Sequence, residues 1–141
     1  MVPALPPSPP PAAPLVEVID GRGGPVLLSV AHSGRDYPVE LLARARLGQA
    51  SLERLEDPLV DRLVIGAIDR GAGAVIARAP RALIDVNRAP GELDPAAIAG
   101  RSGAAPTARA RAGLGLIPTR LAGLGALWRT PISEAELERR L

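Results

Sequence analysis

His32 is the residue best suited to metal chemistry, because it stands where an apolar strand is predicted to end. It is the only histidine of the 141 residues, and it follows the run "PVLLSVA" at residues 25–31. In open α/β sheets, ligands bind in crevices outside the carboxyl ends of strands, so this position favours an active site. A neutral imidazole binds zinc well. The alternative is a histidine that makes ordinary hydrogen bonds in a turn.

Carboxylates downstream of His32 could complete a metal site, which normally needs three protein ligands. Glu56 and Asp57 precede the most helix-like segment of the chain, and Asp61 lies one turn further along it. These acids also have structural interpretations. Asp57 can cap the helix and complement its dipole, and Asp61 can pair with an exposed arginine. Residue types and spacing leave both interpretations open.

The stretch "RALIDVNR" at residues 81–88 carries a second possible chemistry. Asp85 lies near the end of a predicted strand, and Asn87 and Arg88 stand together just beyond it. An arginine grips a carboxylate with two parallel hydrogen bonds, and an asparagine adds one donor and one acceptor. The pair therefore predicts a site for an anionic substrate. The alternative is a local salt bridge from Asp85 to Arg81 or to Arg88.

The elements that must position these residues follow from hydrophobic patterning. Short apolar or alternating runs predict strands, and the run at residues 25–31 has the pattern of a strand buried on both faces. The strands are expected at residues 15–20, 25–31, 74–79 and 82–86, and the helices at 38–47, 57–73 and 133–141. The last helix opens with a capping box. This order predicts an α/β fold with a mixed or parallel sheet flanked by helices, followed by an irregular segment at residues 87–125.

Composition excludes several classes of protein. The absence of cysteine excludes disulfides and thiolate metal sites. The arginines are scattered, there is no lysine, and the formal charge is only +2, which argues against a nucleic-acid partner. Residues 1–14 are rich in proline and are predicted to be disordered, without the features of a secretory signal. With no apolar stretch long enough for a membrane, we expect a cytoplasmic protein without membrane contacts.

Four motifs in order resemble the N-terminal half of the N-formylglutamate amidohydrolase family. They are "AHSGRDYP", "EDPLVDRL", "PRALIDVNRAPGELDP" and "AGLGLIPTR", and the similarity runs from about residue 25 to the end of the chain. The resemblance implies a metal-dependent hydrolase acting on N-formyl-L-glutamate, in histidine degradation, or on a related N-acyl amino acid. It also implies the α/β fold of the zinc-carboxypeptidase and aspartoacylase group (phosphorylase/hydrolase-like), here incomplete.

The resemblance assigns roles by position. His32 corresponds to the first ligand of Zn²⁺ or another divalent metal, and the carboxylate ligand falls in "EDPLVD", where Asp57 is favoured over Glu56. Asn87 and Arg88 match the pair that holds the carboxylate of the substrate. Arg81 and Ser33 are further candidates for substrate binding.

Family members are considerably longer than this sequence. Their second half carries another histidine segment and a carboxylate suited to general acid/base work, and neither is found here. We therefore expect residues 15–141 to be the N-terminal part of a single amidohydrolase domain, truncated at its C-terminus and inactive alone. A complementary C-terminal half would be its partner if the gene is split. The alternative is a non-catalytic remnant or binding module derived from the family.

Overall fold

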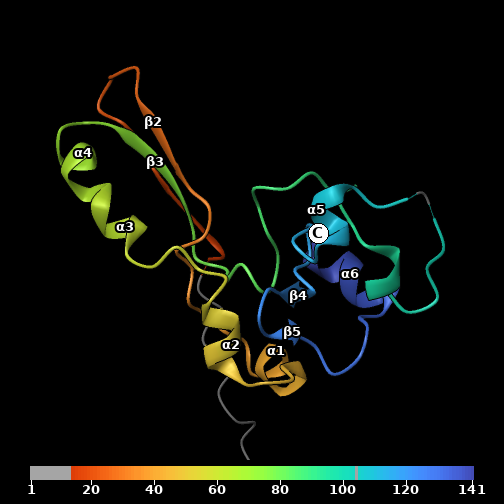
Figure 1. Ribbon diagram of the computed structural model, residues 1–141. Helices are drawn as coiled ribbons and strands as arrows, with labels where there is room; N and C mark the ends of the chain where they lie inside the picture. Colours follow the sequence, from red (N-terminus) through yellow and green to blue (C-terminus); the bar gives the residue numbers. More distant parts are fainter. Residues whose placement is uncertain (1–13, 104) are drawn as a thin grey trace, which may run out of the picture.

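The computed structural model describes residues 14–103 and 105–141, and a small mixed sheet lies at one end of the molecule (Figure 1). Its strands are β1 (Val16–Ile19), β2 (Leu27–Val30) and β3 (Gly73–Ala77), in the order β1-β3-β2. β1 runs antiparallel to β3 and β2 runs parallel to it. These three strands and the mixed α/β class are confirmed. The predicted disordered tail lies, except for its last residue, outside the described residues.

Two short helices, α3 (Val60–Leu63) and α4 (Ile65–Asp69), lie along one face of the sheet (Figure 1). The sequence predicted one continuous helix here, and that prediction is wrong. The β-branched residues Val60, Val64 and Ile65 and the following glycine lower the helix propensity of the segment. Leu59 begins α3 with a left-handed backbone, φ 67°, and no side chain caps it. Asp57 is therefore not a helix cap.

In this chain β2 is buried on one face only, and not on both faces as predicted. Leu28 and Val30 pack in the cluster between the sheet and the two helices. Leu27 points to the opposite face and is 70% exposed. The cause lies in the packing of the sheet. β2 is an edge strand, and the helices cover only the face that carries Leu28 and Val30.

A second cluster forms beside the sheet from short helices and a hairpin. α1 (Val39–Arg44) confirms a predicted helix, whereas α2 (Gln49–Glu53) was not predicted. The hairpin strands are β4 (Arg120–Leu121) and β5 (Gly125–Ala126). The buried members of this cluster are Leu41, Ala45, Leu52, Leu55, Ala82, Leu127 and Trp128. The Trp128 indole donates to the carbonyl of Pro118 at 2.6 Å, which satisfies its only polar group.

The predicted strand at residues 82–86 is a turn in the structure. The amide of Leu83 donates to the carbonyl of Pro80 at 2.8 Å, which folds the chain back locally. The amide of Asp85 donates to the carbonyl of Leu116 at 2.8 Å, so a distant loop and not a sheet neighbour holds this segment. Between this turn and the hairpin, the described residues form η1 (Pro95–Ala97) and α5 (Ala108–Arg111) and otherwise irregular structure.

The last helix, α6 (Glu134–Arg140), confirms its prediction. The Ser133 hydroxyl accepts a hydrogen bond from the amide of Glu136 at 3.2 Å, as expected of its cap residue. The carboxylate of Glu136 does not reach back to the cap. It pairs with Arg44 and Arg140 and so ties α6 to α1. None of the helices in the described part of the chain has the length and hydropathy needed to cross a bilayer.

Ser133→Ala is expected to lower the free energy of unfolding by about 1 kcal/mol, because it leaves an amide of the first turn without its partner. Urea denaturation followed by circular dichroism measures this loss. Ser102, which is exposed, provides the matched control, and Ser102→Ala should change stability by less than about 0.5 kcal/mol. Equal effects of the two substitutions would contradict the capping role.

Candidate functional site

His32 lies between two carboxylates that come from distant parts of the sequence. It follows β2 by two residues and is buried. Its Nδ1 is 3.0 Å from Oδ2 of Asp57, and its Nε2 is 2.8 Å from Oδ1 of Asp85. The structure therefore brings together the histidine, one of the two candidate carboxylate ligands and the aspartate of "DVNR".

Asp85 is completely buried and accepts several hydrogen bonds. Besides the imidazole, its donors are Nε of Arg81 at 2.8 Å and the amide of Asn87 at 3.0 Å. The guanidinium of Arg88 approaches to 3.7 Å. Burial by itself raises the pKa of this carboxyl, but the hydrogen bonds from His32 and Asn87 and the charge of Arg81 outweigh it and lower the pKa to about 2. The predicted salt bridge between Asp85 and Arg81 is thus present, and the same carboxylate also accepts the hydrogen bond from His32.

The ionised Asp85 orients the imidazole. A carboxylate can only accept hydrogen bonds, so Nε2 of His32 must carry the proton in this contact. Nδ1 then faces Asp57 at the exposed side of the cluster. In metal sites a ligand histidine usually donates its other ring N–H to a carboxylate, which fixes the ring and raises its basicity. The pairing with Asp85 has this form.

Asp57 and Glu56 have different environments although they are adjacent. The amide of Asp57 donates to the carbonyl of His32 at 3.0 Å, and its side chain is 58% exposed. The Glu56 carboxylate is nearly buried and accepts from the Tyr37 hydroxyl and from Nε of Arg35, the latter at 3.3 Å. Burial and the hydrogen bond to Glu56 raise the pKa of Tyr37. Of the two acids, Asp57 is the one that contacts the imidazole.

The two candidate arginines are largely engaged inside the protein. Arg81 donates to Asp85 and, through Nη1, to the carbonyl of Leu55 at 3.3 Å. Arg88 donates to the carbonyl of Leu114 at 3.1 Å and to that of Asn87 at 2.7 Å. Its side chain is 12% exposed, whereas Asn87 is exposed.

The turn after His32 is tightly packed. The Ser33 side chain is buried, and its hydroxyl has no hydrogen-bond partner among the described residues. Gly34 lies directly against the backbone that follows β3, because a Cβ added to it would be 2.2 Å from the carbonyl oxygen of Ala79. This close approach explains the glycine in "HSG" and holds His32 at the end of the sheet.

The geometry at Nδ1 fits a divalent metal in part. Zinc–ligand bonds of about 2.0–2.1 Å at tetrahedral angles place two ligand atoms roughly 3.3 Å apart. The 3.0 Å between Nδ1 of His32 and Oδ2 of Asp57 is close to this value. Within residues 14–103 and 105–141, however, no group of three or more His, Cys, Asp or Glu side chains is arranged to hold a metal ion.

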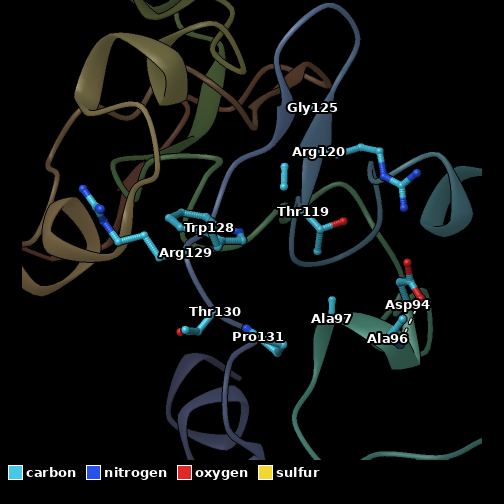
Figure 2. A pocket seen from close by; sticks show the side chains of 11 residues that line it. Asp94, Ala96, Ala97, Thr119, Arg120, Gly125, Trp128, Arg129, Thr130 and Pro131 are labelled. Carbon is cyan, nitrogen blue, oxygen red and sulfur yellow. Dashed lines mark hydrogen bonds between the residues drawn. The ribbon is translucent and has the colours of Figure 1, made fainter.

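A pocket of about 390 Å³ lies elsewhere, between the hairpin and η1 (Figure 2). Trp128, Thr119, Arg120 and Arg129 line it together with small apolar residues. None of the residues of the His32 cluster contributes to it. Its charged lining residues are Asp94, Arg120 and Arg129, and the only histidine of the sequence is not among them, so the candidate site remains the polar cluster around His32.

The model of the N-formylglutamate amidohydrolase family matches residues 24–141. The chain belongs to this family. The match covers everything from the start of β2 to α6, and with it every candidate site residue. No curated protein sequence matches the chain.

A solved member of the N-formylglutamate amidohydrolase family has a similar structure. The N-formylglutamate amidohydrolase from Ralstonia eutropha JMP134 shares 29% sequence identity with this chain, and its crystal structure superposes on it with a TM-score of 0.78. The alignment covers 89% of this chain and 45% of the Ralstonia chain. The present chain thus spans less than half the length of that amidohydrolase.

The hydrogen bond between Asp85 and His32 was not predicted from the sequence. Asp85 was considered only as a salt-bridge partner of the arginines. One local signal existed, because an aspartate often accepts from the amide two residues later, as Asp85 does from Asn87. That signal predicts a buried, oriented carboxylate but not the imidazole that it contacts. The pairing of Tyr37 with Glu56 had no comparable signal.

Proposed function

We propose that this chain forms part of a metal-dependent amidohydrolase that hydrolyses N-formyl-L-glutamate or a related N-acyl amino acid. The complete domain would have the zinc-carboxypeptidase and aspartoacylase type of fold. The observation that carries the proposal is the oriented imidazole, with Nδ1 of His32 3.0 Å from Asp57 and Nε2 bonded to the buried Asp85. Membership in the family supports the same activity.

His32 and Asp57 would hold the metal, zinc or another divalent ion. When bound, the ion supplies Lewis acidity toward an amide carbonyl and toward water. Asp85 keeps the proton on Nε2 and thereby keeps Nδ1 available as a ligand. Glu56, held by Tyr37 and Arg35, would fix the segment from which Asp57 projects.

Arg88 and Asn87 would bind the carboxylate of the substrate. Asn87 is exposed beside the cluster, and the charge of Arg88 is only partly balanced by Asp85 at 3.7 Å. Bidentate binding by Arg88 would orient the substrate relative to the metal ligands. The Ser33 hydroxyl, which has no hydrogen-bond partner within the described part of the chain, is a further donor. Arg81 is assigned instead to holding Asp85.

The 141-residue chain by itself would bind zinc weakly and would not turn over substrate. Its sequence contains a single histidine, and zinc sites of hydrolases use three protein ligands. The third ligand and the general acid/base would come from a complementary segment, equivalent to the part of the Ralstonia protein that this chain does not span.

The test joins this chain to that remaining part of the Ralstonia amidohydrolase and measures zinc content and release of formate from N-formyl-L-glutamate. We expect one zinc per fused molecule, metal-dependent hydrolysis, and loss of both in His32→Ala. Asp36→Asn, at an exposed carboxylate close in sequence, is the matched control and should keep both.

Two results would contradict the proposal. Retention of zinc and hydrolysis by the His32→Ala fusion protein would show that His32 is not a ligand. Zinc affinity in the micromolar range, or turnover, by the 141-residue chain alone would show that no complementary segment is needed.

A further inference from the structure

The edge strand β1 exposes two of its three apolar side chains. Its residues are Val16, Glu17, Val18 and Ile19, and the two valines lie on one face and are exposed, Val18 by 68%. Ile19 packs under the helices, and Glu17 pairs with Arg78. A strand with one solvated face normally has the opposite arrangement, with polar residues outward. The pattern of β1 is therefore that of a strand covered on both sides.

The same face of the sheet continues across β3 and β2. In the register, Val75 of β3 lies between Val18 of β1 and Ser29 of β2. Leu27 is next to Gly73, which has no side chain to shield it. This face carries the exposed Val16, Val18 and Leu27, the half-buried Val75 and the exposed Ser29, and we call it the open face. The other side of the same sheet is buried under α3 and α4 (Figure 1).

Both the sequence and the free edge of β2 favour a cover for the open face. The run at residues 25–31 has the pattern of a strand buried on both sides. Within the described residues, β2 pairs only with β3, so its outer edge has unpaired backbone groups. Exposed apolar surfaces next to an unpaired edge are sites of association.

We propose that the open face is a docking surface for a second polypeptide segment, equivalent to the part of the Ralstonia amidohydrolase that has no counterpart in this chain. That enzyme shares the fold of 89% of this chain, yet more than half of its own length lies outside the shared part. The segment that fits is aliphatic on one side, so that it covers Val18 and Leu27 as α3 and α4 cover the opposite side.

The absence of cysteine from the sequence allows a direct measurement. Single substitutions Val18→Cys and Leu27→Cys report on the open face. Leu63→Cys is the matched control, because Leu63 is also largely exposed, by 79%, but lies on α3. The rate of alkylation by iodoacetamide is followed by intact mass, alone and with the remaining part of the Ralstonia enzyme. That part is added both as a separate polypeptide and as a fusion after Leu141.

We expect rapid alkylation of all three variants in the isolated chain. The Ralstonia segment should slow Val18→Cys and Leu27→Cys at least tenfold and leave Leu63→Cys within twofold. Unchanged rates at the open face in both formats, or equal slowing of all three variants, would overturn the proposal. Slow labelling of the open face in the isolated chain, with a doubled mass in solution, would overturn it in favour of a second copy. The alkylation rates do not depend on zinc or turnover. They therefore test docking even if the proposed hydrolase activity fails.

Discussion

Asp85→Asn is expected to lower the free energy of unfolding by about 3–5 kcal/mol, the cost of removing one member of a buried ion pair. The asparagine keeps the shape of the side chain, so no cavity forms. It removes the charge that Arg81 faces, and its amide nitrogen would present a second donor to Nε of Arg81 or to Nε2 of His32. Equilibrium unfolding in urea measures the loss.

The dependence of this loss on pH identifies its cause. The folded-state pKa of Asp85 is about 2, below the ordinary value of 3.8. The carboxylate therefore contributes fully above about pH 4, and its contribution disappears as the pH falls toward 2. The difference between parent and variant should narrow over the same range. Asp36→Asn, at an exposed site, should cost less than about 0.5 kcal/mol, and a similar cost for both variants would refute the buried pair.

Gly34→Ala is expected to destabilise the protein by about 3 kcal/mol or more, an effect at the upper end of those caused by overpacking. The added Cβ would lie 2.2 Å from the carbonyl oxygen of Ala79 and 2.4 Å from that of Arg78. Both are backbone atoms, so a change of side-chain rotamer cannot relieve the contact. The turn must move away from the end of β3, and His32 must move with it.

Thermal and urea denaturation of Gly34→Ala measure this effect. Gly91→Ala is the matched control, because a Cβ there would meet no atom within 4 Å. This control should leave stability within about 0.5 kcal/mol or raise it slightly by restricting the unfolded chain. Normal stability of Gly34→Ala would mean that the turn does not lie against Ala79.

Local patterning predicted the elements that depend on local forces. The strands around Val18, Leu28 and Ile76 and the capped helix after Ser133 follow from alternation, apolar runs and capping. The wrong predictions concern segments whose structure depends on contacts with distant residues. Residues 82–86 have the composition of a strand, but bonds to Pro80 and Leu116 make them a turn.

The candidate site was predictable in its residue types and not in its contacts. His32 and the carboxylates were identified from sequence, and the family motifs favoured Asp57 over Glu56. The structure supplies what spacing cannot, since the contacts join His32 to residues 25 and 53 positions away. Arg81 donates to the buried Asp85 and Arg88 to the half-buried carbonyl of Leu114. These contacts depend on the same long-range folding, so the presence of arginines near a motif does not show which of them face solvent.

The polar cluster has a consequence for how the chain unfolds. The hydrophobic core is divided into three small clusters, and His32, Asp57 and Asp85 each follow a member of a different one. Those members are Val30, Leu55 and Ile84. The imidazole, which lies 3.0 Å from Asp57 and 2.8 Å from Asp85, therefore links three units that are individually too small to be stable. Cooperativity of unfolding therefore rests on the same side chains that the proposed metal site would use, so a substitution at any of them is expected to affect both.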